Sequence, residues 1–433
     1  MQISRREPRV PFRAVASALT ACALALVACG GGGDAGVSPP SSSSPSVPSV
    51  PSAAALPPQG TLLQTTWSAY PRLVRLAHQA DPARNGRIVA SVTESVDGGL
   101  QAGFHASEDD GATFGRLGTL RDPGFAGGLC CGTLFELPRA VGVLPAGTLL
   151  YAASVGQDGV GPAMEQPIFR SDDGGATFRR IGGATCGRAA VARRSGTGGM
   201  DGTGVWEPEF LVAADGTLAC LHSDETEPGF SQVLKITTTT NGLVWTAPRV
   251  VVAGPDVTDR PGMATVRRRP DGRYALSYER CSTRRLDCAA HLRVSADGLD
   301  WGAPDAVDVQ PRTADGRLLR HAPTLAAVPS PTAPGGATLL LIGQLVALES
   351  GGVDTAVNGR SVFVATSGDG SGPWRAAAAP IGLPAAPALG NWCQNYSTAM
   401  LPSSDGTRLL LMQTDFGADG RCVARYGSGA LAR

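Results

Sequence analysis

The sequence predicts an all-β protein: a single six-bladed β-propeller of four-stranded antiparallel blades, spanning residues 60–433. Three observations lead to this prediction. A short pattern recurs along the chain at intervals that suit one blade. The residues between its copies form short apolar runs separated by Asp-Gly, Asn-Gly or Gly-Gly turns, as expected for consecutive strands. No amphipathic helix can be recognised after the first 29 residues.

The recurring pattern is S-x-D-x-G-x-T-[FW], or a shortened form of it. Its copies begin at Ser107, Ser171, Thr239, Ser295 and Ser367, so successive copies are 64, 68, 56 and 72 residues apart. These intervals match the length of one four-stranded blade with its loops. In a tight turn the Asp or Asn side chain satisfies backbone N–H groups, while glycine takes a conformation that other residues resist. We therefore expect the pattern to act in folding and not in catalysis.

The pattern resembles the Asp-box of sialidases and related propellers. Five blades then carry a box, and we expect the remaining, box-free blade to open the propeller at about residues 61–97. A C-terminal strand is expected to close the ring.

The N-terminal region predicts export and a lipid anchor. Residues 1–29 combine an arginine-rich start with a short apolar run, as in a signal peptide. The run ends in Leu26-Val27-Ala28-Cys29, which resembles a bacterial lipobox and would make Cys29 the lipidated residue; a plain cleaved signal peptide is the alternative. Residues 30–59 are rich in Gly, Ser and Pro and are expected to be a disordered tether. We expect an exported lipoprotein of the outer membrane.

Charge and cysteine content limit the possible partners. The 37 basic and 37 acidic residues balance, so neither nucleic acid nor an anionic membrane surface is an expected partner, and the lipid would be the sole membrane attachment. In an exported protein, an even number of cysteines predicts disulfides. We expect neither a metal nor a cofactor, because no CxxC or HxxxH motif is present. We also expect a monomer. The eight cysteines after Cys29 are Cys130, Cys131, Cys186, Cys220, Cys281, Cys288, Cys393 and Cys422.

The connectivity of these cysteines cannot be deduced from the sequence. A Cys281–Cys288 bridge could close a short loop after Glu279, and a Cys393–Cys422 bridge could hold the end of the chain.

Two glutamates are the candidate catalytic residues. Glu207 and Glu279 each lie in a hairpin-like segment with aromatic and basic neighbours, and they are 72 residues apart, about one blade. A propeller gathers the first strand of each blade around its axis, so such residues can converge. Glycoside hydrolysis requires two carboxyls at one site. We therefore expect Glu207 and Glu279 to face each other across a sugar-binding cleft.

Several motifs resemble glycoside hydrolase family 93, the exo-arabinanases. They are Trp206-Glu207-Pro208-Glu209, Arg260-Pro261-Gly262-Met263 and the opening Tyr70-Pro71-Arg72-Leu73-Val74. That family has a sialidase-like six-bladed propeller and releases arabinobiose from linear α-1,5-arabinan with retention. The resemblance implies that Glu207 is the general acid/base and Glu279 the nucleophile, although the two roles could be exchanged. Pro208 is expected to restrict Glu207 to an extended conformation.

Aromatic and amide side chains suit the faces and hydroxyls of a neutral sugar. The segment Gly390–Tyr396, which we expect to be a loop of the last blade, contains both kinds of side chain. Core packing or structural hydrogen bonds are the alternative role for each candidate, and His222, His321 and Asn358 are weaker candidates still. The substrate-binding candidates are Arg72, Trp206, Asp224, Arg260, Tyr278, Trp392, Asn395 and Tyr396.

Two other functions remain open. A sialidase would use three arginines, for which Arg72, Arg260 and Arg360 are available, and a tyrosine nucleophile such as Tyr396. The other alternative is a non-catalytic surface propeller that binds a glycan or a protein, which would have no need for two converging carboxyls.

Overall fold

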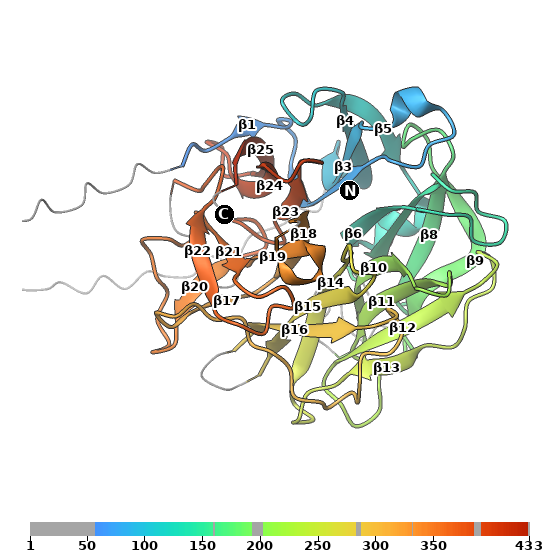
Figure 1. Ribbon diagram of the computed structural model, residues 1–433. Coiled ribbons are helices and arrows are strands. Elements are labelled where there is room, and N and C mark those ends of the chain that lie inside the picture. The colour runs from blue at the N-terminus through green and yellow to red at the C-terminus, as the bar shows by residue number, and fades with distance from the viewer. Residues whose placement is uncertain are drawn as a thin grey trace, which may run out of the picture. The chain divides into compact units, whose positions relative to one another are not determined.

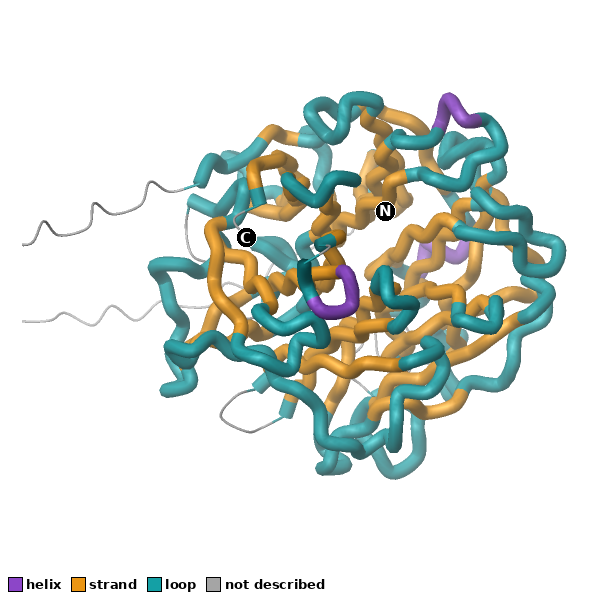
Figure 2. Tube along the Cα trace, in the orientation of Figure 1, coloured by secondary structure: helices purple, strands orange, loops and turns teal. Residues whose placement is uncertain are grey.

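Consecutive strands along the chain pair with one another to form the six sheets of a β-propeller (Figure 1). The computed structural model describes residues 57–158, 161–192, 202–282, 287–330, 332–384 and 391–431. Strands and loops make up nearly all of these residues (Figure 2). The predicted fold class, an all-β six-bladed propeller of antiparallel sheets, is confirmed. The predicted signal peptide, with Cys29, and most of the tether lie outside the described residues.

The strands of the first three blades follow the order of the chain. Blade 1 contains β2 (Ser68–Arg75), β3 (Ile88–Val96), β4 (Gly99–Ser107) and β5 (Gly115–Leu120). Blade 2 contains β6 (Leu129–Glu136), β7 (Leu149–Val155), β8 (Glu165–Ser171) and β9 (Arg179–Arg188). Blade 3 contains β10 (Val205–Val212), β11 (Leu218–Asp224), β12 (Val233–Thr239) and β13 (Arg249–Val252).

The last three blades are less regular. Blade 4 contains β14 (Arg260–Arg268), β15 (Tyr274–Cys281) and β16 (Ala289–Ser295), extended by β17 (Arg317–Arg320) and β20 (Leu345–Leu348). Blade 5 contains β18 (Thr324–Pro329), β19 (Ala337–Ile342), β21 (Ser361–Ala365) and β22 (Trp374–Ala378). Blade 6 contains β23 (Ala399–Pro402), β24 (Arg408–Phe416), β25 (Cys422–Ala430) and β1 (Thr61–Leu62). Three short 3-10 helices are η1 (Pro82–Arg84), η2 (Pro123–Gly127) and η3 (Pro334–Gly336).

The N-terminal strand closes the ring. β1 pairs antiparallel with β25 and is the outermost strand of blade 6 (Figure 1). The expectations of a closing C-terminal strand and of a box-free opening blade were therefore wrong. In blades 1 to 5 the Asp-box pattern follows the third strand, at the turn into the outer part of the blade. Blade 6 lacks it because its fourth strand comes from the other end of the chain, so no such turn exists there.

Apolar side chains fill the space between neighbouring blades. Each of the six largest buried clusters combines residues from two adjacent blades. Strand β7 shows how one strand serves two clusters: Leu149 and Tyr151 pack between blades 1 and 2, whereas Leu150 and Ala152 pack between blades 2 and 3. Successive side chains of a strand point to opposite faces of its sheet. Both faces of the blade are thus buried, which explains its continuous apolar run.

Disulfides join the eight cysteines in four pairs. The Cys281–Cys288 and Cys393–Cys422 bridges, which the sequence left as possibilities, are present. The other two pairs are Cys186–Cys220, between β9 and β11, and Cys130–Cys131, between adjacent residues.

Among the described residues, no helix is long and apolar enough to cross a membrane.

Hydrogen bonds explain why the turn after β8 has its sequence. The carboxylate of Asp173 accepts hydrogen bonds from the hydroxyl of Ser171 at 2.7 Å and from the backbone N–H and hydroxyl of Thr177 at 2.9 and 2.6 Å. Its neighbour Asp172 instead forms surface ion pairs with two arginines. One aspartate holds the turn together, and the other faces solvent.

We predict that Asp173→Ala destabilises the protein far more than Asp172→Ala. Removal of Asp173 leaves three donors without their acceptor and should lower the free energy of unfolding by about 1–3 kcal/mol. Loss of the exposed ion pairs of Asp172 should cost only about 0–1 kcal/mol. Equilibrium urea unfolding of both variants measures the difference, and equal midpoints for the two would contradict the role given to this turn.

Candidate active site

Each blade places one residue with a left-handed backbone at the start of its innermost strand. In blades 1 to 4 this residue lies at a β-bulge, where the pairing with the second strand shifts register. In blades 5 and 6 it lies two residues before the first residue of the strand. Non-glycine residues with positive φ are uncommon and concentrate at functional sites. We call the six residues the bulge ring: Tyr70 (φ 54°), Cys131 (φ 61°), Glu207 (φ 51°), Met263 (φ 57°), Ala322 (φ 45°) and Ser397 (φ 54°).

Members of the bulge ring pack together although they come from different blades. Tyr70, Met263 and Ala322 form one buried cluster, and Cys131 and Tyr396 pack against it. These residues belong to blades 1, 2, 4, 5 and 6 or the loops that lead into them, so they can meet only where the blades converge. The bulge ring therefore surrounds the propeller axis at one end of the inner strands.

Glu207 is the ring residue of blade 3. One of its carboxylate oxygens, Oε2, accepts hydrogen bonds from the hydroxyl of Ser223 at 2.5 Å and from the backbone N–H of Met263 at 3.1 Å. Burial raises the pKa of Glu207, and these two hydrogen bonds oppose the rise. The expectation that Pro208 keeps Glu207 extended was wrong, because the bulge imposes a left-handed conformation that turns this side chain out of the strand's regular alternation.

Glu279 approaches the same place from the second strand of blade 4. It lies opposite Gly262, the residue before ring member Met263, and its Oε2 accepts the backbone N–H of ring member Ala322 at 2.6 Å. Only 13% of its side chain is exposed. Burial raises the pKa of Glu279 to about 8, and the nearby carboxylate of Glu207 adds to the rise. The structure thus brings both predicted glutamates to the bulge ring, where their charges interact.

Aromatic side chains stand beside the two carboxyls. The hydroxyls of Tyr70 and Tyr396 both approach the sulfur of Met263, at 3.8 and 3.9 Å. Burial, and then the charges of Glu279 and Glu207, raise the pKa of Tyr396 well above its ordinary value. The indole of Trp392 packs edge-on against Tyr396, with ring centroids 5.3 Å apart, and is 69% exposed. It provides an exposed aromatic surface beside Tyr396.

The predicted arginines already have partners. Arg72 is buried, lies over the ring of Tyr70 at 4.1 Å and donates to the hydroxyl of Ser397 at 2.9 Å. Arg260 forms an ion pair with Glu225, and its positive charge lowers the pKa of both candidate glutamates. Both arginines lie near the ring, where they hold neighbouring side chains in place.

Other predicted site residues form hydrogen bonds or pack within the protein. Asn395 is buried and donates to the backbone carbonyls of residues 343 and 344, while half-buried Trp206 packs beside Val205. The prediction that Tyr278 stacks on a sugar was wrong: its ring is buried in the core between blades 3 and 4, and its hydroxyl donates to Asp308. Tyr278 and Glu279 are neighbours on one strand, so only one of them can face the ring.

Two further sequence candidates also turn inward. Asp224 is buried, forms an ion pair with Lys235 at 3.0 Å and accepts hydrogen bonds from Thr226, so it is not placed to bind substrate. Arg360 donates to backbone carbonyls at Leu383 and residue 384, on the outer part of blade 5. The described residues therefore do not assemble the three arginines that a sialidase would need.

His321 and a disulfide complete the surroundings of Glu279. The ligand atoms of Glu279, Cys281, Cys288 and His321 lie within 4.8 Å of one another. Because thiolates bind metals and these two cysteines are joined in a disulfide, this group does not form a metal site in this state. Burial, followed by the charge of Arg320, lowers the pKa of His321 to about 4, so its imidazole is neutral at pH 7.

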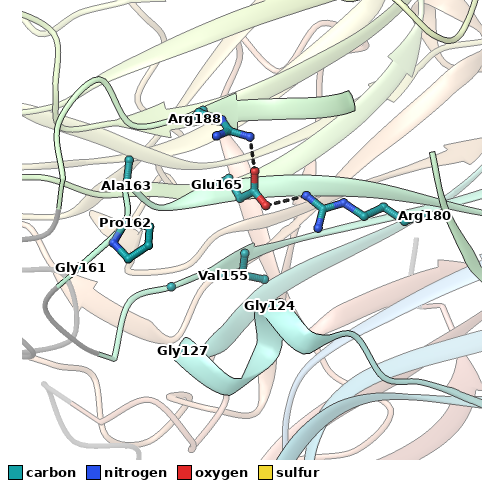
Figure 3. A pocket seen from close by; sticks show the side chains of 10 residues that line it. Gly124, Gly127, Val155, Gly161, Pro162, Ala163, Glu165, Arg180 and Arg188 are labelled. Carbon is teal, nitrogen blue, oxygen red and sulfur yellow. Dashed lines mark hydrogen bonds and ion pairs between the residues drawn. The ribbon is translucent and has the colours of Figure 1, made fainter. Parts of the chain in front are cut away.

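A separate pocket of about 430 Å³ lies on blade 2 (Figure 3). Glu165 is its central charged residue and forms ion pairs with Arg180 and Arg188, both at 2.5 Å. Neither Glu207 nor Glu279 lines this pocket. It is therefore distinct from the carboxyl pair.

The sequence contained a signal for the bulge ring that was not recognised. Three of the six ring residues precede proline, in Tyr70-Pro71, Glu207-Pro208 and Ala322-Pro323. The groups that hold the two carboxyls could not be inferred from the sequence. They are the hydroxyl of Ser223 and the backbone N–H groups of Met263 and Ala322, which meet the glutamates only through pairing between strands and packing between blades.

The fold is a six-bladed propeller in which two carboxyls meet at the bulge ring. No family model and no curated protein matches the sequence. Among solved structures, the α-L-arabinofuranosidase of Fusarium graminearum covers 88% of this chain and 99% of its own at 19% identity and a TM-score of 0.69. The α-L-arabinanase of Penicillium chrysogenum, solved with arabinobiose, covers 87% of this chain and 99% of its own at 21% identity and a TM-score of 0.68.

These two structures show which propellers the chain is similar to in fold. The Fusarium protein is described as a member of glycoside hydrolase family 93, and it too has been solved with arabinobiose. At about 20% identity the likeness establishes the fold. The expected structural resemblance to family 93 is therefore confirmed.

The raised pKa of Glu279 predicts a pH-dependent stability. Between its ordinary pKa of 4.5 and about 8, the folded protein retains a proton that the unfolded chain has lost, so stability falls as pH rises through this window. Glu279→Gln removes the titrating carboxyl and with it this fall in stability. We expect the variant to gain stability relative to the wild type between pH 5 and pH 8, on the order of 2–4 kcal/mol, measured by thermal unfolding at both values.

The matched control is Glu108→Gln, which replaces a 60% exposed glutamate in a surface ion pair. Its stability relative to the wild type should change little over the same range. A constant difference between Glu279→Gln and the wild type from pH 5 to pH 8 would contradict the buried-carboxyl interpretation.

Proposed function

We propose that this protein is a glycoside hydrolase that cleaves arabinan, or a similar neutral polysaccharide, from a chain end with retention of configuration. The observation that carries the proposal is the meeting of Glu207 and Glu279 at the bulge ring. A propeller that only binds glycans has no need for two largely enclosed carboxyls with raised pKa values at one site. The arabinan-degrading proteins that share the fold support arabinan as the first substrate to test.

A neutral substrate fits the surroundings of the carboxyls. Tyr396 and Trp392 present aromatic rings, which suit the C–H faces of sugars. Arg72 and Arg260 are engaged within the protein, so they do not provide a free set of cations for an acidic sugar. These features favour the hydrolysis of a neutral glycan over the sialidase alternative.

The two glutamates have environments that suit different roles. Two hydrogen bonds to Oε2 of Glu207 stabilise its ionised form, whereas Glu279 accepts one backbone hydrogen bond and has a pKa of about 8. We assign Glu279 as the acid that protonates the leaving oxygen and Glu207 as the nucleophile that attacks the anomeric carbon. The deprotonated Glu279 then activates water, which releases the sugar and regenerates both groups. This exchanges the roles that the family resemblance implies.

Substitution of either glutamate tests the function. The wild-type domain should release arabinobiose from linear arabinan, and Glu207→Gln and Glu279→Gln should each lower kcat by about 10³-fold or more, because each removes one of the two groups the reaction needs. Chromatography of the products measures the release, with Glu108→Gln as the exposed control. Unchanged turnover in both site variants would contradict the catalytic roles assigned to Glu207 and Glu279.

Azide distinguishes the two roles in the same experiment. A small anion can replace a missing nucleophile or attack an intermediate that lacks its base, and the configuration of the glycosyl azide differs between the two cases. We expect Glu207→Ala to give a glycosyl azide with inverted anomeric configuration. Glu279→Ala should give a glycosyl azide with retained configuration. The opposite result would restore the roles implied by the family resemblance.

We also propose that the chain is exported and held by lipid at Cys29. The lipobox-like segment supports this proposal, and four disulfides suit an oxidising compartment. Cys29→Ala should abolish the incorporation of labelled palmitate and release the protein from the membrane fraction. Continued membrane association of an unlabelled Cys29→Ala protein would contradict lipid anchoring.

A further inference from the structure

The blade 2 position of the bulge ring is occupied by a disulfide between adjacent residues. Cys130 and Cys131 are bonded to each other on β6, and both are partly exposed. The other described bridges are more enclosed: both cysteines of Cys186–Cys220 and of Cys393–Cys422 are buried, as is Cys288. The Cys130–Cys131 bridge is thus the one described disulfide that presents both of its residues at the surface of the molecule.

The position of this disulfide connects it with both glutamates. Cys131 packs against the cluster formed by Tyr70, Met263 and Ala322. The backbone N–H of Met263 binds one candidate glutamate and that of Ala322 binds the other. Strand β6 also packs beside β10, which carries Glu207. The sulfur atoms therefore border the same small area as the carboxyl pair.

Chain stabilisation does not explain a bridge between neighbours. A disulfide stabilises a fold chiefly by restricting the unfolded chain, and the effect grows with the length of the loop it closes. Cys130 and Cys131 are already joined by a peptide bond, so their bridge encloses no loop. By contrast, Cys186–Cys220 spans 34 residues and joins two blades. Another role is required for the bridge on the ring.

The bridge provides a rigid, apolar surface. Two free thiols would rotate about their side-chain bonds and offer weak donors, whereas a disulfide is polarisable and has no S–H donor. The strand at the next residue packs closely on the core, because a side chain at Gly132 would lie 2.3 Å from the hydroxyl of buried Tyr151. The disulfide therefore stands on a closely packed part of blade 2.

We propose that the Cys130–Cys131 disulfide is a substrate-contacting surface of the active site, against which the C–H face of a neutral sugar ring packs. The inference rests on the proposed function and adds a binding surface to it. Cys131 and Tyr396 both pack against the Met263 cluster, and the disulfide contributes an apolar contact without a hydrogen-bonding group. Its contribution is to sugar binding, while Glu207 and Glu279 perform the chemistry.

Removal of the bridge should weaken substrate binding with little effect on the chemical step. For Cys130→Ala/Cys131→Ala we expect KM for linear arabino-oligosaccharides to rise about 5–50-fold while kcat changes less than about threefold, as for lost ground-state binding. The control, Cys186→Ala/Cys220→Ala, removes a buried bridge between blades and should lower Tm with KM unchanged. An unchanged KM in the first variant would overturn the proposal.

Native reduction provides a second route if the alanine variant does not fold. Folded wild-type protein is treated with a phosphine reductant, and alkylation with mass spectrometry identifies which bridge has opened. Opening of Cys130–Cys131 should raise KM and leave kcat nearly unchanged, and reoxidation should restore KM. Full affinity with this bridge open would contradict the proposal.

Failure of the proposed function has a different signature. If the wild-type protein does not cleave arabinan, the same pair of variants is compared on an array of neutral glycans. Binding of another glycan that is lost with the Cys130–Cys131 bridge supports the disulfide surface and refutes arabinan hydrolysis. Binding unaffected by the bridge, or no binding to any neutral glycan, overturns the proposed surface.

Discussion

Six left-handed residues at the starts of the inner strands determine where the site forms. A regular strand would direct these side chains into the packing between blades, where the core is apolar. In blades 1 to 4 a bulge releases this residue from that alternation, and in blades 5 and 6 the residue lies just before the strand begins. Such backbone conformations cost on the order of 1–3 kcal/mol each for residues other than glycine, so the surrounding structure must impose them. The bulge ring is consequently a strained part of the fold and the part that brings the blades' side chains together.

Hydrogen bonds between blades keep this ring in place. The residue two positions after a ring member repeatedly binds the next blade. Thr133 donates to Glu209 at 3.0 Å, Glu209 accepts from the backbone of Val266 at 3.1 Å, and the hydroxyl of Thr265 accepts from the backbone of Leu325 at 3.1 Å. These groups are buried, so leaving one without a partner would be costly. The polar layer beside the axis therefore fixes the relative positions of the blades on which the two carboxyls depend.

The sequence predicted the fold well because the evidence for it is local. Turn patterns, short apolar runs and blade-length intervals depend only on nearby residues, and the motifs around Glu207 and Glu279 were sufficient to select both glutamates. The errors came from properties that are not local. The direction of Tyr278 depends on the phase of its strand, and the closing strand β1 depends on a partner at the other end of the chain. A residue before proline is normally extended, but the bulge gives Glu207 a left-handed conformation.

The unequal occupants of the bulge ring explain how one symmetrical fold can carry an asymmetric site. Blades 1 to 4 contribute Tyr70, Cys131, Glu207 and Met263, whereas blades 5 and 6 contribute the small residues at 322 and 397. Backbone N–H groups of the ring also hold the carboxyls, since that of residue 322 binds Glu279 and that of Met263 binds Glu207. Larger side chains on the other blades supply a carboxylate, sulfur and an aromatic ring. Because the fold repeats the same backbone position six times, a change of side chain there can alter the chemistry while the packing between blades is preserved.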